Sequence, residues 1–237
     1  LGIKELWDID KEKCKPGTVF HSVGWPLPSD TYGGSFLYHL SDNQVSVGYV
    51  VGLDYKNPFL SPFEEFQRFK KHPSICSIFE GGRRVSYGAR ALNEGGFQSI
   101  PKLTFPGGCL VGCTAGFLNV PKIKGTHTAM KSGMVAAEAV FEAVSQDAIE
   151  PTSYEVKLQN SWLWKELYKV RNIRPSFSKG FLVGMIYSAF DTFILRGNAP
   201  WTFKHHEDHL QLKDARFCKK IEYPKPDNII SLSLIHI

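Results

Sequence analysis

The sequence predicts a mixed α/β fold, on three observations. Hydrophobic residues make up 43% of the 237 positions, which is ample for a buried core. Short stretches rich in aromatic and β-branched residues alternate with stretches that carry a helical apolar period. No internal repeat or low-complexity tract interrupts them. The net charge of +5 is scattered; it does not favour nucleic acid as a partner, although it suits an anionic membrane surface.

The strand-like stretches begin with a predicted β-hairpin. Ser35–Leu40 and Val45–Tyr55 are separated by the polar turn Ser41-Asp42-Asn43-Gln44. Short strands are also expected at Val85–Ala89 and Cys109–Cys113, the second of them buried.

The first helix is predicted from its start signal. Ser61-Pro62-Phe63-Glu64 offers an N-cap, a proline at the first helical position and a glutamate at the third, so the helix should run to about Lys71, before Pro73. The buried side is expected to hold Phe63, Phe66 and Phe69. The pairs Glu64-Glu65 and Arg83-Arg84 are interpreted as exposed charges.

Two longer helices are predicted further along. Thr126–Val144 has an apolar period, and Thr152–Val170 should be a single helix that leads into the basic corner Arg171–Pro175. The inner face of the first is expected to consist of Ala129, Met130, Gly133, Met134, Ala136, Ala137, Val140, Phe141 and Val144.

The cysteines and histidines do not predict a disulfide framework or a metal site. The five cysteines form no C-x-x-C pair and are odd in number, which favours a reducing compartment. Cys109 and Cys113 are interpreted as small core residues, and the histidines of KHHEDH, at positions 204–209, as part of a solvated loop.

The stretch from Gly107 to Gly133 reads strand, glycine loop, helix. Such a loop lets backbone N–H groups approach an anionic or electron-rich ligand, and a helix N-terminus there would stabilise negative charge on a reduced flavin. By spacing alone, glycines that serve only packing explain the pattern equally well.

The identities of the residues favour a ligand-binding loop over glycines that serve only packing. Residues 84–140, together with GWPLPSDTYGGSFLYHL, VVGLDYKNPFLSPFEEFQRFKKHPSI, NSWLWKELYKVRNIRP and IEYPKPD, resemble the electron-transfer-flavoprotein:ubiquinone oxidoreductase family over nearly the whole chain. The resemblance implies the C-terminal part of a glutathione-reductase-type FAD domain, interleaved with a β-sheet quinone-binding domain. It also implies FAD and a 4Fe-4S cluster, with the cluster ligands and the G-x-G-x-x-G for FAD outside this chain.

Candidate site residues follow from the resemblance. The FAD contacts it implies are Gly112, Cys113, Gly116, Gly125 and Thr126. Cys113 stands where related flavoproteins carry an aspartate, so its contact would be through the backbone. The ubiquinone contacts it implies are Tyr32, Gly33 and Gly34; without the resemblance, a Gly-Gly bulge at a strand start would be the simpler interpretation.

Gly180–Leu195 is strongly apolar, yet shorter than the about 20 residues of a membrane-spanning helix. Lys179 and Arg196 flank it, which favours a segment that lies in the membrane interface; a buried core segment is the alternative. The predicted membrane contacts are Phe181, Leu182, Met185, Ile186, Phe190, Phe193 and Ile194.

The domain expectation divides the chain into four parts. Residues 1–90 are expected to be mainly ubiquinone-binding, 91–145 to carry the second FAD contact segment, 146–215 to be helical and membrane-contacting, and 216–237 to begin an iron–sulfur domain. Both ends are expected to be internal cuts, with some non-native residues at the C-terminus.

The implied activity is electron transfer from reduced electron-transfer flavoprotein to ubiquinone. The expected location is the matrix face of the mitochondrial inner membrane, or a bacterial plasma membrane. No catalytic side chain is predicted, since catalysis would consist of cofactor positioning, and the piece alone should be inactive. The alternatives are another membrane-associated FAD reductase of the same fold and a non-enzymatic membrane-binding module.

Overall fold

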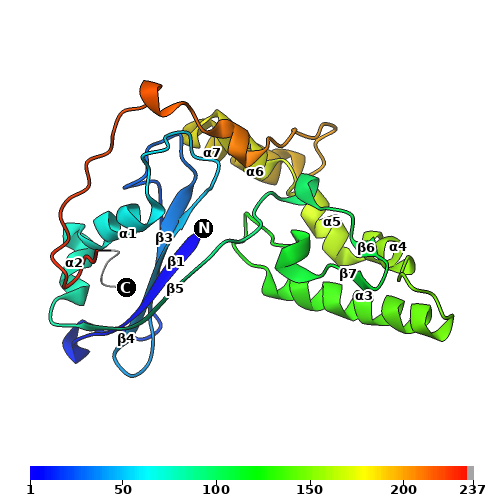
Figure 1. The fold of residues 1–237 in the computed structure, drawn as a ribbon, viewed down its shortest axis with the longest axis horizontal. Helices are drawn as coiled ribbons and strands as arrows, with labels where there is room; N and C mark the ends of the chain where they lie inside the picture. The colour runs from blue at the N-terminus through cyan, green and yellow to red at the C-terminus, as the bar shows by residue number, and fades with distance from the viewer. Residues whose placement is uncertain (234–237) are drawn as a thin grey trace. The chain divides into compact units, whose positions relative to one another are not determined.

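The computed structural model describes residues 1–233, and the chain divides into two compact units (Figure 1). Unit 1 comprises Leu1–Ala91 together with the segment that begins at Glu207, and unit 2 comprises Leu92–His206. The last four residues of the predicted non-native ending lie outside the described part. The four-part domain division remains a prediction.

Unit 1 is built on an antiparallel five-stranded sheet with the order β2-β3-β4-β1-β5. The strands are β1 Gly2–Asp8, β2 Val19–Val23, β3 Gly33–His39, β4 Gln44–Val51 and β5 Arg83–Arg90. The predicted hairpin is confirmed as β3–β4, and Asp42 and Asn43 in its turn both have a φ of 59°. β4 ends at Val51, before the predicted Tyr55, because the chain turns after Gly52, whose N–H bonds to the Tyr32 carbonyl at 2.8 Å.

Helices α1 (Pro62–Lys70) and α2 (Pro73–Phe79) belong to unit 1. The predicted cap is present, since Ser61 Oγ accepts a hydrogen bond from the Glu64 N–H at 3.4 Å. Phe66 and Phe69 are buried as expected, whereas Phe63 is only half-buried. The sequence interpretation missed α2: Pro73 stops α1 and also occupies the first position of a new helix, which His72 Nδ1 caps.

The core of unit 1 lies between these helices and one face of the sheet. It contains Trp7, Ile9, Leu27, Leu37, Val45, Val47, Tyr49, Val51, Leu60, Phe66, Phe69, Ile75, Phe79 and Ile230.

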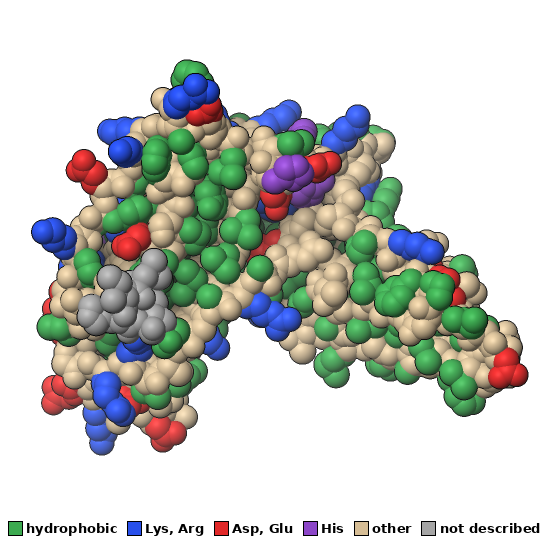
Figure 2. Space-filling model, viewed as in Figure 1, with side chains coloured by type: hydrophobic (Ala, Val, Ile, Leu, Met, Phe, Trp, Pro, Cys, Tyr) green, Lys and Arg blue, Asp and Glu red, His purple; other side chains and the backbone are tan. Residues whose placement is uncertain are grey.

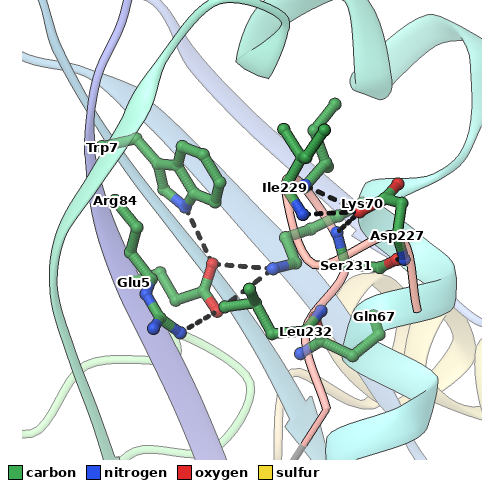
Figure 3. Close-up of polar contacts among 10 residues, drawn as sticks. Glu5, Trp7, Gln67, Lys70, Arg84, Asp227, Ile229, Ser231 and Leu232 are labelled. Carbon is green, nitrogen blue, oxygen red and sulfur yellow. Dashed lines mark hydrogen bonds and ion pairs between the residues drawn. The ribbon is translucent and has the colours of Figure 1, made fainter. Parts of the chain in front are cut away.

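A buried ion pair lies beside this core (Figure 3). Lys70 Nζ donates to both carboxylate oxygens of Glu5, at 3.1 and 2.9 Å, and Trp7 Nε1 donates to Glu5 Oε2 at 2.8 Å. Arg84 approaches the same carboxylate at 3.7 Å, so the interpretation of Arg84 as an exposed charge is wrong. Glu65 is buried as well, so its interpretation as an exposed charge is also wrong; its carboxylate accepts hydrogen bonds from Arg68 and from Tyr223.

The C-terminal segment completes unit 1. Asp227 Oδ1 accepts the backbone N–H groups of Ile229, Ile230 and Ser231, each at 2.9 Å (Figure 3). The Leu232 N–H donates to Gln67 Oε1 on α1 at 2.9 Å. This turn thereby places Ile230 in the core.

Unit 2 is mainly helical. Its elements are β6 Thr104–Phe105, β7 Gly108–Cys109, α3 Thr126–Ser145, α4 Ser153–Gln159, α5 Trp162–Lys169, α6 Ile173–Ser176 and α7 Phe181–Phe190. A π-helix, Asp191–Leu195, continues α7. The 3₁₀-helices of the two units are Lys11–Lys13, Phe97–Ser99, Gly112–Ala115, Phe177–Lys179, Asp208–Gln211 and Ala215–Phe217.

Two element predictions in unit 2 are wrong. The predicted strand Cys109–Cys113 is paired only at Gly108–Cys109, and a 3₁₀-helix begins at Gly112, where φ is +63°. The predicted helix Thr152–Val170 is two helices, because Asn160 caps α4 and Ser161 adopts an extended conformation before α5.

The helix α3 lies where the sequence predicts it, and Ala136 of its predicted inner face is buried, but the larger side chains assigned to that face are not. The side buried in the second core carries Thr128, Ser132, Val135, Ala136 and Ala139. Met130, Met134, Val140, Phe141 and Val144, which were assigned to the inner face, are exposed. Figure 2 shows hydrophobic side chains along the edge of unit 2 where α3 runs in Figure 1. The apolar period of α3 therefore marks two faces, and this chain covers one of them.

Candidate functional site

The glycine loop at Gly112–Gly116 packs tightly against α3. Gly112 and Gly116 both have positive φ, +63° and +82°, which side chains rarely adopt. The Gly112 N–H donates to Ser132 Oγ at 2.9 Å, and a Cβ on Gly112 would lie 3.3 Å from the Ala129 Cβ. Glycine is thus needed at Gly112 both for conformation and for space.

The first turn of α3 lies against the same loop. A Cβ on Gly125, the N-cap, would lie 3.1 Å from Leu118 Cδ1 and 3.4 Å from Cys113 Sγ. Gly125 has no side chain that could cap the helix. Thr126, the first residue of α3, is exposed. The first N–H groups of a helix have no partner within the helix, so this end offers hydrogen-bond donors to a ligand.

The structure therefore brings together the five residues predicted to contact FAD. It also adds a neighbour that the sequence interpretation missed: a Cβ on Gly116 would lie 3.2 Å from Asn93 Nδ2. The amide of Asn93 accepts the Gly95 N–H at 3.2 Å, in a turn that contains Gly95 and Gly96. The sequence gives no local signal for Asn93, because its approach to Gly116 exists only in the folded loop.

The residues predicted to contact ubiquinone, Tyr32, Gly33 and Gly34, lie at the start of β3. The carbonyls of Tyr32 and Gly33 accept hydrogen bonds from Gly52 and Gly24. A Cβ on Gly33 would collide with Leu27 and with the Val50 carbonyl, and a Cβ on Gly34 with the Ser22 carbonyl. The two glycines are therefore required by the packing of unit 1 itself, and their contact with ubiquinone remains a prediction.

Exposed apolar side chains surround this end of β3. Val23 pairs with Gly34 across β2–β3, Trp25 follows Val23 along the chain, and Leu53 follows Gly52. Val23, Trp25 and Leu53 are exposed by 64%, 49% and 45%, respectively. An apolar ligand beside Gly34 could therefore contact these exposed side chains.

The segment predicted to contact a membrane is helical throughout, as α7 and the π-helix that follows it. All seven predicted contact residues are at least 39% exposed, and Phe193 reaches 77%. The inward side carries Gly184, where a Cβ would collide with the Phe177 ring, and the buried Asp191. Unit 2 itself therefore leaves the outer side of this segment uncovered, and the membrane contact remains a prediction. Within residues 1–233, no helix has the length and apolar character needed to cross a membrane.

The pKa of Asp191 is raised by its burial, and the nearby Arg171 guanidinium and Tyr187 hydroxyl oppose that rise. Arg171 itself donates hydrogen bonds to the carbonyls of Tyr168, Gly197, Ala199 and Trp201. It thereby connects the loop 197–201, which follows the π-helix, to the end of α5.

Comparison with known proteins shows which family the chain resembles. Residues 1–92 match the family described as ETF-QO, ubiquinone-binding. The chain is 60% identical over 247 aligned residues to the mitochondrial electron transfer flavoprotein-ubiquinone oxidoreductases of Sus scrofa and Homo sapiens, and 57% identical over 235 to that of Arabidopsis thaliana.

The chain is a homologue of electron transfer flavoprotein-ubiquinone oxidoreductase. The similarity covers 99% of the chain, which spans about 40% of the length of the curated relatives from Sus scrofa and Homo sapiens. It includes both units, and so both the Tyr32 to Gly34 segment and the Gly112 to Thr126 segment.

A solved structure shares the fold. It is a geranylgeranyl bacteriochlorophyll reductase-like protein from Thermoplasma acidophilum, with a TM-score of 0.52 and 17% sequence identity. The superposed region covers 81% of this chain and 52% of the reductase-like chain. Mixed α and β structure with an antiparallel sheet is thus confirmed. Over residues 1–233, no group of three or more histidine, cysteine or acidic side chains is arranged to hold a metal ion.

Proposed function

We propose that this chain is part of an oxidoreductase that passes electrons from reduced electron-transfer flavoprotein to ubiquinone, and that it contributes to the binding of both ubiquinone and FAD. The observation that carries the proposal is 60% identity to such enzymes over 99% of the chain. The 4Fe-4S cluster of the complete protein would be held by residues outside this chain.

Unit 2 would hold the flavin ring of FAD, as the C-terminal part of a glutathione-reductase-type domain. Bound FAD would supply the redox centre. Gly112 and Gly116 keep the loop close to α3, Cys113 contributes through its backbone, and Gly125 and Thr126 present the N–H groups of the helix start. Donors at a helix N-terminus stabilise negative charge, so they would raise the affinity of the site for the reduced form of the cofactor.

Unit 1 would bind ubiquinone at the start of β3. Tyr32, Gly33 and Gly34 would contact the headgroup through backbone groups, and Val23, Trp25 and Leu53 would contact the apolar tail. No side chain is required as an acid or base in this arrangement. The role of this end of the sheet is to bind and orient the substrate.

The exposed face of α7 and the π-helix would dock on the membrane surface without crossing it. The charged Lys179 and Arg196 at its two ends suit the headgroup region. The relatives with 60% identity are named as mitochondrial proteins. We therefore assign the chain to the mitochondrial inner membrane, on the matrix side.

The proposal is tested with the full-length protein that contains this chain, purified in detergent. We expect a visible flavin spectrum, bleaching of that spectrum by reduced electron-transfer flavoprotein, and reduction of a soluble ubiquinone analogue that depends on the flavoprotein. Bound flavin without quinone reduction would overturn the proposal in favour of a reductase with another substrate, and a colourless protein would favour a membrane-binding module.

A further inference from the structure

One carboxylate in unit 2, that of Glu166, joins elements far apart in sequence. Glu166 lies on α5, and its Oε1 atom accepts hydrogen bonds from Asn119 Nδ2 at 2.7 Å, Lys122 Nζ at 2.9 Å and His127 Nε2 at 3.0 Å. Asn119 and Lys122 precede Gly125, and His127 follows it. The carboxylate is therefore hydrogen-bonded to residues on both sides of the turn that begins α3.

The loop held by Glu166 is itself closed. Asn119 and Lys124 exchange two backbone hydrogen bonds, at 3.0 and 3.3 Å, and Asn119 Oδ1 accepts the Lys122 N–H at 3.2 Å. Ile123, within the loop, has a φ of +54°. Asn119 is fully buried, so the anchor of this loop lies inside unit 2.

A second contact from α5 supports the same turn. Trp162 lies one helical turn before Glu166, and its ring stacks on that of His127 with centroids 5.8 Å apart and planes only 9° apart. The imidazole is thus fixed in plane by Trp162 and in direction by Glu166.

The carboxylate keeps its charge at every physiological pH. Burial raises the pKa of Glu166, but the hydrogen bonds from His127, Lys122 and Asn119 outweigh it and lower the pKa to about 2. A charged acceptor makes stronger hydrogen bonds than a neutral one. A glutamine at this position would retain the shape but lose that strength.

We propose that Glu166 is a positioning residue for the flavin site: it fixes the first turn of α3, and thereby Gly125 and Thr126, against the loop Gly112–Gly116. The inference rests on the proposed function, since it assigns FAD to that turn. Glu166 does not contact the cofactor; it acts through His127 and the closed loop.

The test compares full-length Glu166→Gln with wild type and with Glu138→Gln. Glu138 is an exposed residue of α3, about three helical turns after Thr126, and its carboxylate lies 4.0 Å from Lys157 Nζ. Its substitution by glutamine therefore makes the same change of charge away from the proposed flavin site. For each protein we would measure the dissociation constant of FAD, the midpoint potential of the bound flavin, its visible circular dichroism and the thermal midpoint.

For Glu166→Gln we expect the dissociation constant of FAD to rise by roughly tenfold or more, as for loss of a charged hydrogen bond, with altered circular dichroism and a shifted potential. Glu138→Gln should match wild type in all the flavin measurements. Lys122→Met removes one exposed donor and should cause a smaller change in the same direction; it decides the question if Glu166→Gln does not fold.

A Glu166→Gln protein with unchanged FAD affinity, potential and circular dichroism, but a lower thermal midpoint, would overturn the positioning role and leave the proposed function intact. A wild-type protein without FAD would instead refute the proposed function on which the inference depends.

Discussion

Glu5 and Lys70 stabilise each other's charge inside unit 1, where both side chains are shielded from water. The pKa of Lys70 is lowered by burial, and the Glu5 carboxylate opposes that change. Removing one partner leaves the other charge buried, with only the more distant Arg84 near Glu5. The cost of such a change exceeds what the intact pair contributes to stability.

We predict that Lys70→Met lowers the free energy of unfolding of unit 1 by about 3–5 kcal/mol. The matched control is Arg83→Met, which breaks the exposed ion pair of Arg83 with Asp8 and should cost far less, because water screens that pair. Urea unfolding followed by circular dichroism measures both. Equal effects in the two variants would contradict a buried, mutually dependent pair.

Glu166 gives a pH-dependent prediction. Its pKa is lowered from 4.5 to about 2 in the folded protein, so its contribution to stability is present above pH 4.5 and is lost as the pH falls toward about 2. At neutral pH, Glu166→Gln should lower the free energy of unfolding by about 1–2 kcal/mol. The difference from wild type should shrink steadily in urea titrations below about pH 4.5, and a constant difference over that range would contradict the assignment.

At the level of residues, the sequence predicted charges poorly. Lys70, Glu65 and Arg84 look like surface charges in a linear reading, because their partners Glu5 and Tyr223 are far away along the chain. The pairing of β1 with β5, the packing of α1 against β1 and the return of the C-terminal segment bring those partners together. Tertiary contacts of that range leave no local pattern.

Among the elements, α7 offers a direct test of membrane docking. We predict that Leu182→Ser, Ile186→Ser and Phe193→Ser, combined in the full-length protein, abolish sedimentation with vesicles that contain an anionic lipid, because all three side chains are exposed and apolar. Ile149→Ser, Phe217→Ser and Ile229→Ser remove equally exposed apolar groups elsewhere and should leave binding unchanged. Vesicle binding that survives in the α7 variant would assign the anchor to another part of the protein.

The open face of α3 predicts the behaviour of this chain on its own. Met130, Met134, Phe141 and Val144 form an exposed apolar stripe at helical spacing. The isolated 237-residue chain should therefore self-associate, and Met134→Lys with Phe141→Lys should reduce its apparent mass in light scattering. Ala137→Lys, on the same side but with a smaller apolar group removed, should have a weaker effect. A monomeric wild-type chain would contradict the prediction.

Elements with strong local patterns were predictable. The hairpin β3–β4 and the helices α1 and α3 carry alternation, a cap or a helical period in their own residues. The strands β1 and β2 lacked such patterns, and α2 was hidden because Pro73 was treated only as a stop. The division between α4 and α5 depends on two residues, Asn160 and Ser161, whose capping preference was outweighed by the apolar period around them.

For the whole molecule, the candidate sites came from resemblance to a family and not from periodicity. That resemblance located the cluster of Gly112, Cys113 and Gly125, which the structure brings together. It also pointed to Gly33 and Gly34, which the structure shows to be required by the close approach of Val50 and Ser22. Glu166 and Asn93 were missed because their roles exist only once the loops are folded.

The central claim is that unit 1 binds ubiquinone at the start of β3. The most direct measurement is photolabelling of the full-length protein with an azido-ubiquinone, with and without an excess of unlabelled ubiquinone, followed by peptide mapping. We expect competed label on peptides that contain Val23, Trp25, Tyr32 to Gly34 or Leu53. Competed label confined to residues 92–206, or label that unlabelled ubiquinone does not displace, would contradict it.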